Sequence, residues 1–252
     1  MTGTAPSSHS AATAPGPDTQ PRTPPAAPAP PAPPVPPVPP TAPAKEQGRV
    51  DAYIRTAVPV SLRCGERTHQ ATLTTFHNLM DAREHLAVLL GRPRTSVPLV
   101  RLHSECLTGD VFGSERCDCG AQLDESLAQI ATVGGVLLYL RQEGRGIGLY
   151  NKLDAYRLQD RGLDTYAANR ALGLEADARD YTAAAQMLLA LGHREIDLLT
   201  NNPDKRHQLE RNGISVRCMV PTMVHLTAQN SAYLKAKATI TAHTLSLEGL
   251  HK

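Results

Sequence analysis

Three of the five cysteines of this chain lie in one short segment, HSECLTGDVFGSERCDCG (residues 103–120). A single residue separates Cys117 from Cys119, and Cys106 is near enough for a loop to return it to them. Soft thiolate ligands select zinc or an iron–sulfur cluster. A structural zinc usually takes four protein ligands, whereas a catalytic zinc keeps one position for water. The spacing predicts a metal site and leaves both kinds of zinc open, with His103 as a candidate fourth ligand.

A disulfide framework is a weaker explanation for these cysteines. Their number is odd and the chain starts without the pattern of an export signal, which favours a reducing, cytoplasmic setting. No stretch approaches the apolar length of a membrane span. A net charge of +2 and few aromatic residues give little to attract nucleic acid. We therefore expect a cytoplasmic protein that binds neither membrane nor nucleic acid.

Two polar segments have residue types that suit an anion. RQEGRGIG (141–148) combines arginine forks for phosphate oxygens with glycines that let the backbone approach, and Lys152 follows one helical turn later. TNNPDK (200–205) opens an expected helix, whose first turn offers free N–H groups and the positive end of the helix dipole. No GxxxxGK[ST] phosphate loop is present. Taken alone, each segment is equally an ordinary turn or helix start.

A third polar pair, Asp177 and Arg179, lies two positions apart in EADARDYT. A surface salt bridge of little energetic value is the simpler interpretation of this pair alone. Together with an open zinc site, however, the three segments describe a pocket for a phosphorylated ligand beside a metal-activated water. The chemistry to expect is hydrolysis of a phosphorylated or nucleotide substrate.

The elements that must position these residues change character along the chain. Residues 52–103 are β-prone except for one expected helix, DAREHLAVLLG (81–91), and predict a small β-rich N-terminal unit. From residue 121 onward strands alternate with helices, which predicts an α/β unit with a partly parallel sheet and hence a mixed α/β fold. Ligands of such sheets bind at the carboxyl ends of strands. We expect helices at 121–133, 149–160, 181–191 and within 201–213, and strands at 136–140, 195–200 and 214–220.

Four segments resemble the signature segments of the GTP cyclohydrolase II family, in the family's order. They read RLHSECLTGDVFGSERCDCGAQL, YLRQEGRGIGLYNKLDAYRLQDRGLDT, ANRALGLEADARDYTAAAQML and LLTNNPDKRHQLERNGI. The resemblance implies a zinc-dependent hydrolase that opens the imidazole ring of GTP in the first step of riboflavin biosynthesis. Formate and pyrophosphate would be released and 2,5-diamino-6-ribosylamino-4(3H)-pyrimidinone 5′-phosphate formed.

The resemblance also implies roles for single residues. The three cysteines would hold one zinc per subunit, magnesium would assist the phosphates, and the enzyme would be a homodimer. Asp177 would accept a proton, Arg179 would attack the α-phosphorus, and Tyr156 would complete deformylation. An electrostatic clamp is the physical alternative for Arg179, because a guanidinium is effectively always protonated. The residues implied to contact GTP are Arg101, Leu102, His103, Ser104, Glu105, Gln122, Glu143, Gly144, Arg145, Thr165, Thr200 and Lys205.

The expected organisation is a disordered Pro/Ala-rich tail (1–48), a catalytic domain (49–225) and a C-terminal segment (226–252). The tail is too short for the dihydroxybutanone phosphate synthase domain that precedes this one in many family members, so we expect a monofunctional chain. Two alternatives remain open. One is a variant that stops at the formylamino-pyrimidine, against which Tyr156 argues; the other is a zinc-stabilised nucleotide-binding protein without turnover.

Overall fold

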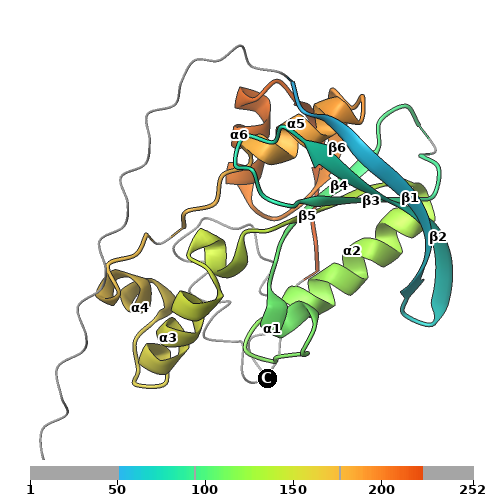
Figure 1. The fold of residues 1–252 in the computed structure, drawn as a ribbon. Coiled ribbons are helices and arrows are strands. Elements are labelled where there is room, and N and C mark those ends of the chain that lie inside the picture. Colours follow the sequence, from blue (N-terminus) through green and yellow to red (C-terminus); the bar gives the residue numbers. More distant parts are fainter. Residues whose placement is uncertain (1–50, 94, 176, 224–252) are drawn as a thin grey trace, which may run out of the picture. The chain divides into compact units, whose positions relative to one another are not determined.

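The computed structural model describes residues 51–93, 95–175 and 177–223. Figure 1 shows how their helices and strands are arranged. The expected tail (1–48) and the C-terminal segment (226–252) lie outside the described residues, so the domain boundaries stay predictions.

One seven-stranded mixed sheet organises the described residues, with strand order β1-β2-β3-β5-β4-β6-β7. The first three strands and β5 are joined by antiparallel pairing, whereas β5, β4, β6 and β7 run parallel. The predicted mixed α/β class is confirmed, with the β-rich N-terminal part forming the antiparallel side of the common sheet. The strands are β1 (Tyr53–Cys64), β2 (Arg67–His77), β3 (Leu86–Leu90), β4 (Leu99–Ser104), β5 (Gly135–Leu140), β6 (Glu195–Leu199) and β7 (Ser215–Val220).

Helices cover both faces of this sheet (Figure 1). On β5, Val136 and Leu138 pack with α5 and α6, whereas Leu137 packs with Ile130 of α2 on the opposite face. The alternation follows from the period of two residues in a strand, and because both faces of β5 are covered, its sequence GVLLYL is almost wholly apolar. The helices are α1 (Leu107–Asp110), α2 (Cys119–Val133), the 3-10 helix η1 (Glu143–Gly146), α3 (Leu149–Gln159), α4 (Thr165–Ala171), α5 (Thr182–Ala190) and α6 (Pro203–Arg211).

One expected helix is wrong. The segment DAREHLAVLLG holds strand β3, which pairs with β2 on one side and β5 on the other. Ala87 and Leu90 are fully buried between these neighbours. A short apolar run fits a buried helix or a buried strand equally well. Here the segment forms a strand because its backbone can hydrogen-bond to β2 on one side and to β5 on the other. The start of α6 agrees with expectation, because the Asn202 side chain accepts a hydrogen bond from the backbone N–H of Asp204 at 3.0 Å.

The chain order of the parallel strands creates a crevice at their carboxyl ends. From β4 the chain passes to β5 on one side and later returns to β6 on the other. A reversal of this kind separates the loops that follow neighbouring strands, and open α/β sheets bind their ligands there. The loops after β4, β5, β6 and β7 therefore meet at one edge of the sheet.

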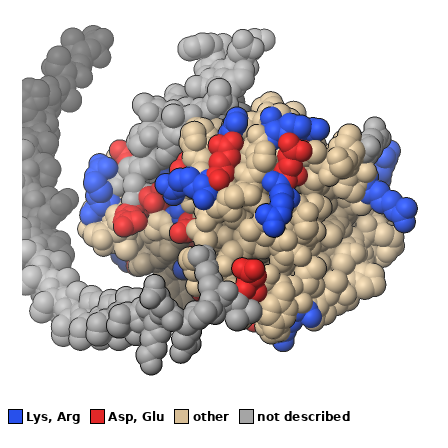
Figure 2. Space-filling model, turned by 90° about the horizontal axis from the view of Figure 1, so that it is seen from above, with Lys and Arg blue, Asp and Glu red and all other residues tan. Residues whose placement is uncertain are grey.

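The surface seen in Figure 2 carries acidic and basic side chains close together. Pairs such as Arg206 with Glu210 on α6, at 2.8 Å, belong to the exposed ion pairs of the molecule. Among the described residues, no helix is both long enough and apolar enough to cross a membrane.

Candidate metal-dependent active site

Two glycines allow the three cysteines to converge. Cys106 lies just after β4, Cys119 begins α2 and Cys117 precedes it by two residues, and the short helix α1 packs against α2. A Cβ on Gly109 would stand 2.9 Å from the Cys117 sulfur and 3.2 Å from the Cys106 sulfur, and a Cβ on Gly120 would stand 2.5 Å from the Gly109 carbonyl oxygen. Neither position has room for a larger side chain. The sequence therefore needs glycine here to close the sulfur cluster.

The sulfur cluster fits zinc. The Sγ atoms of Cys106, Cys117 and Cys119 all lie within 4.8 Å of one another, and those of Cys106 and Cys117 are 3.6 Å apart. Sulfurs at ~2.3 Å from a tetrahedral zinc are about 3.8 Å apart. The hydrogen bond with Cys106, together with burial, raises the pKa of the Cys117 and Cys119 thiols, so a bound cation would be needed to hold them as thiolates. Hydrogen bonds from the other two thiols, with the nearby Lys152 ammonium, lower the pKa of Cys106.

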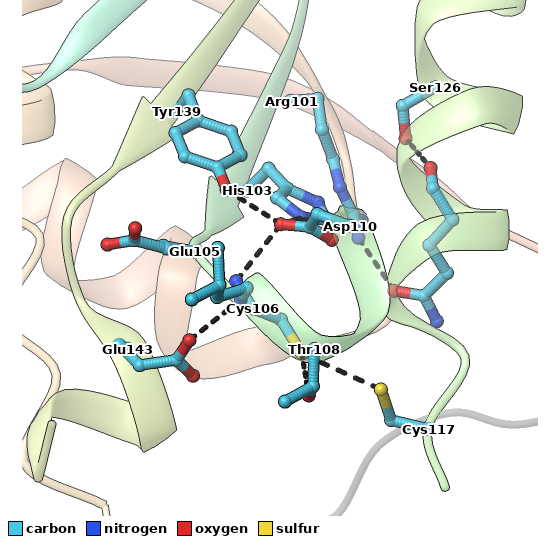
Figure 3. Close-up of polar contacts among 12 residues, drawn as sticks. Arg101, His103, Glu105, Cys106, Thr108, Asp110, Cys117, Ser126, Tyr139 and Glu143 are labelled. Atoms are coloured by element: carbon cyan, nitrogen blue, oxygen red, sulfur yellow. Dashed lines mark hydrogen bonds and ion pairs between the residues drawn. The ribbon is translucent and has the colours of Figure 1, made fainter. Parts of the chain in front are cut away.

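His103 is hydrogen-bonded to a carboxylate and does not point to the three sulfurs as a fourth ligand would. The His103 ring nitrogen Nε2 lies 3.1 Å from both carboxylate oxygens of Asp110, and burial lowers the pKa of the imidazole. Asp110 also accepts hydrogen bonds from the Tyr139 hydroxyl at 2.8 Å and the Cys106 backbone N–H at 3.0 Å (Figure 3). In the described part of the chain the metal-ligand cluster holds the three cysteines alone. The fourth-ligand role considered for His103 is therefore not supported.

A buried lysine closes the cluster from the side of α3. The Lys152 ammonium lies 3.1 Å from the Cys106 sulfur, 2.9 Å from the Thr108 hydroxyl and 2.8 Å from a carboxylate oxygen of Glu143. The other oxygen of Glu143 accepts a hydrogen bond of 2.7 Å from the backbone N–H of Leu107 in α1. Lys152 was expected beside a phosphate, but the structure places it against the cysteines.

The loop after β6 forms the opposite wall of the crevice. The Thr200 hydroxyl accepts a hydrogen bond from the Asn202 backbone N–H at 3.0 Å, which fixes the approach to α6. Lys205, in the first turn of α6, is buried and donates to the Leu102 carbonyl oxygen at 2.7 Å. Asn201 bonds to the Thr222 hydroxyl at 2.9 Å and thereby ties this loop to the end of β7. A cation and a helix N-terminus thus lie together, an arrangement that favours anion binding.

Arg101 is a buried cation between the two walls. Its guanidinium donates to the Leu199 carbonyl oxygen at 3.1 Å and to the Gln122 side chain at 2.8 Å, and Gln122 in turn donates to Asp118. The Arg101 Nε atom is buried and has no hydrogen-bond partner among the residues that the structure describes. Since an unsatisfied buried donor is costly, this N–H group is available for an acceptor on a ligand.

Asp177 and Arg179 form a two-pronged ion pair. The Arg179 Nε donates to one carboxylate oxygen at 2.7 Å, and a terminal nitrogen donates to the other. Although burial acts in the opposite direction, the Arg179 guanidinium lowers the pKa of Asp177. The Arg145 carbonyl oxygen accepts a hydrogen bond of 3.0 Å from the Ala178 backbone N–H, which holds this segment against the η1 loop. Arg145 itself adopts a left-handed conformation, with φ +62°.

Tyr156 lies on the face of α3 that borders the cleft. Lys152, Ala155 and Gln159 share this face with it, as the helical spacing i, i+3, i+4 and i+7 dictates. The Arg116 guanidinium is 4.8 Å from the centroid of the Tyr156 ring, within range of a cation–π interaction. Burial raises the pKa of the Tyr156 hydroxyl, which therefore stays protonated at neutral pH.

Nearly all predicted site residues line one cleft, which encloses about 1230 Å³ including space open to solvent. Among the exceptions, Leu102 is a core residue that offers only its carbonyl oxygen, and Asp177 reaches the cleft through Arg179. The Thr165 side chain lies outside the described residues. The predicted residues on the cleft wall are Arg101, His103, Ser104, Glu105, Cys106, Cys117, Cys119, Gln122, Glu143, Gly144, Arg145, Tyr156, Arg179, Thr200 and Lys205.

Several functional neighbours were not found by sequence reasoning. Arg116, Asn169, Asn201 and Thr222 also line the cleft. Asp110 lies four residues after Cys106 in the sequence. This short spacing was the only sequence feature that could have indicated the contact between Asp110 and the Cys106 backbone. The others come from separate elements, so their convergence carries no local signature.

Three converging thiolates beside a set of buried cations define a metal-dependent hydrolase site for a phosphorylated ligand. Residues 58–221 match the GTP cyclohydrolase II family. The chain belongs to this family.

Individual relatives agree with the family match. The GTP cyclohydrolase-2 of Vibrio cholerae is 51% identical over 191 residues, which cover 75% of this chain and 96% of the relative. The protein of the same name from Psychromonas ingrahamii is 48% identical and is covered to the same extent, with 76% of this chain aligned. The riboflavin biosynthesis protein RibBA of Bacillus mycoides is 50% identical over 78% of this chain, which spans 51% of that longer protein.

Proposed function

We propose that this chain opens the imidazole ring of GTP by hydrolysis in riboflavin biosynthesis. Formate and pyrophosphate leave, and 2,5-diamino-6-ribosylamino-4(3H)-pyrimidinone 5′-phosphate forms. The observation that carries this proposal is one cleft that holds three cysteine sulfurs and, besides Lys152 at Cys106 and Arg116 at Tyr156, four further buried or half-buried cations. A purine with a phosphate chain presents a hydrolysable ring at one end and anionic oxygens at the other, and so matches both sets of groups. The four further cations are Arg101, Arg145, Arg179 and Lys205.

Cys106, Cys117 and Cys119 would hold zinc, which their converging sulfurs fit. When bound, zinc supplies a Lewis acid that polarises and acidifies water. The protein contributes the shape of the site: Gly109 leaves room for the sulfurs and Asp110 fixes the backbone of Cys106. These contacts would orient the thiolate ligands before GTP arrives.

The phosphate chain would lie between the loop after β6 and the η1 loop. The N-terminal turn of α6 with Thr200 and Lys205 offers hydrogen-bond donors and positive charge on one wall. The η1 loop offers the Arg145 side chain on the other. When bound with the nucleotide, magnesium would offset the negative charge of the phosphate chain.

Arg179 would act as an electrostatic clamp on the α-phosphate. Its guanidinium is already held on two prongs by Asp177, which keeps it oriented and protonated. The lowered pKa of Asp177 also makes this carboxylate a weak proton acceptor. Replacing Arg179 by Lys should then preserve a large share of pyrophosphate release, whereas Arg179→Ala should lose about a hundredfold or more. Equal loss in both variants would favour nucleophilic attack by Arg179.

Tyr156 would complete deformylation by donating a hydrogen bond from its protonated hydroxyl. Its position on the α3 face, one helical turn from Lys152, brings it to the metal side of the cleft. In a Tyr156→Phe variant the formylamino-pyrimidine should accumulate while pyrophosphate release continues. Mass spectrometry separates the two products by the mass of the formyl group.

The decisive experiment is incubation of the zinc-loaded chain with GTP and magnesium, followed by mass spectrometry and assays of formate and pyrophosphate. We expect all three products in equal amounts. No formate under any metal condition would contradict the proposal. We further propose a homodimer acting in the cytoplasm; light scattering of the purified chain tests the dimer, and cell fractionation tests the location.

A further inference from the structure

The geometry points to Lys152 as a positioning residue of the thiolate–metal site, which holds Cys106 and balances its charge. This inference rests on the proposal that the three cysteines bind the metal. Lys152 is buried on the inner face of α3, and its ammonium lies 3.1 Å from the Cys106 sulfur. It comes from a helix 46 residues away in sequence, so the contact is created by the tertiary structure.

The three donors of the Lys152 ammonium are all used within the protein. They point to the Cys106 sulfur, the Thr108 hydroxyl at 2.9 Å and Glu143 at 2.8 Å. An ammonium group has three N–H bonds and no acceptor. With these contacts in place, Lys152 has no donor left for a phosphate. Its partners instead belong to the loop that carries the first metal ligand and to the carboxylate beside it.

Charge explains why a cation is needed there. Three thiolates around one divalent zinc leave a net charge of −1, and two of the three cysteines, Cys106 and Cys117, are buried. An isolated charge in such surroundings is costly, whereas a hydrogen-bonded cation offsets it. Groups that hydrogen-bond to metal ligands orient them and tune the metal. Lys152 supplies both effects to Cys106.

Glu143 connects Lys152 to the loop that carries Cys106. One of its carboxylate oxygens binds the Lys152 ammonium, and the other accepts the Leu107 backbone N–H at 2.7 Å. Leu107 follows Cys106 directly and begins α1. The Lys152–Glu143 pair therefore links α3 to the loop of the first ligand at two points. Loss of the lysine should loosen this ligand more than the other two.

The test measures metal binding on the full chain, without GTP. Zinc affinity is determined by competition with a chromophoric chelator, and the cobalt(II)-substituted protein reports sulfur-to-metal charge transfer. Lys152→Met should weaken zinc about ten- to hundredfold, the range found when partners of metal ligands are removed. It should also move the charge-transfer band to longer wavelength, because a thiolate without its N–H partner is a stronger donor. Lys152→Arg should restore part of both values.

The matched control is Arg157→Met, which removes a cation from the exposed side of the same helix. It should leave the affinity within about twofold and the band unchanged. If circular dichroism shows that Lys152→Met does not fold, the double variant Lys152→Met with Glu143→Gln is used in its place. The double variant no longer contains the Glu143 carboxylate that would otherwise be left without a partner. A folded variant with unchanged affinity and band overturns the inference. A wild-type chain that takes up neither metal contradicts the proposed metal site itself.

Discussion

The two halves of the seven-stranded sheet share one continuous ladder but serve the cleft in different ways. In the half formed by β5, β4, β6 and β7 the strands run parallel, so their carboxyl ends meet at one edge. Every cleft-lining residue of the described chain lies in β4 or after it. In the half formed by β1, β2 and β3 successive strands end at opposite edges. Strand direction therefore decides which half can gather side chains into a site.

The antiparallel half still supports the cleft from outside. The His85 ring, just before β3, accepts a hydrogen bond of 2.9 Å from the Arg141 backbone N–H at the end of β5. The Arg83 guanidinium donates to the Arg141 carbonyl oxygen at 2.9 Å. These bonds hold the start of the loop that carries Glu143. One half thus supplies the reacting groups, and the other fixes where their loops begin.

The sharpest test of this division is removal of one metal ligand from the parallel half. We expect Cys117→Ser to lose zinc and to lower formate release about a thousandfold or more, because several kcal/mol of transition-state stabilisation disappear with the metal. Metal content by mass spectrometry and turnover of GTP check both effects. A variant with full activity and no zinc would contradict the assignment of the site.

A smaller effect is expected from crowding the sulfur cluster. Gly109→Ala places a methyl group 2.9 Å from the Cys117 sulfur, so the ligands must shift apart. Zinc affinity should fall about tenfold or more. Gly113→Ala is the control, since its Cβ meets no atom within 4 Å although its φ of +64° strains an alanine. If both variants bind zinc equally well, the close packing at Gly109 is not what positions the sulfurs.

The antiparallel half should respond in stability rather than in chemistry. Leu90→Ala removes a fully buried side chain of β3 and should cost about 2–5 kcal/mol of unfolding free energy. Because β3 contributes no residue to the cleft wall, kcat/KM should stay within about twofold at temperatures where the protein is folded. Urea denaturation and steady-state kinetics measure the two quantities. A large fall in kcat/KM without unfolding would show that the two halves are coupled.

The smallest effect concerns the pH dependence of stability. The Arg179 guanidinium lowers the pKa of Asp177 in the folded state, so this pair stabilises the protein above the unfolded pKa of 3.8 and loses its effect as pH falls through the folded pKa. Asp177→Asn should therefore be less stable than the wild type at pH 7, and the difference should shrink below about pH 4. A difference that does not change with pH would exclude the ion pair as its source.

Sequence reasoning succeeded where the signal is local. The periodicity of α2 and the capping residues of α6, with Asn202 before Pro203, predicted these elements to within two residues. It failed at β3, whose HLAVLL run has no length or period to separate a strand from a helix until β2 and β5 are present. The helices α1 and α4 were not predicted, since each is short and has no clear apolar stripe.

The same contrast holds for the site. Because thiolates are strong ligands of soft metals, the residue type and spacing of Cys106, Cys117 and Cys119 were enough to predict a metal site. Lys152 carried no such signal, because a lysine on a helix can face solvent, a phosphate or a thiolate. In the structure Lys152 lies on the buried face of α3 together with Ala155, and there its ammonium contacts the Cys106 sulfur.

What the sequence determined by itself is the chemistry available: thiolates for a metal, arginines and a helix start for phosphates, and the alternating elements that make a mixed sheet. What only the tertiary structure decided is which of these groups meet. His103 contacts Asp110 and not the three cysteines, and Lys152 contacts the Cys106 sulfur. The physical reason is that residue types are local properties of the chain, whereas contacts between distant segments follow from strand order, strand direction and close packing.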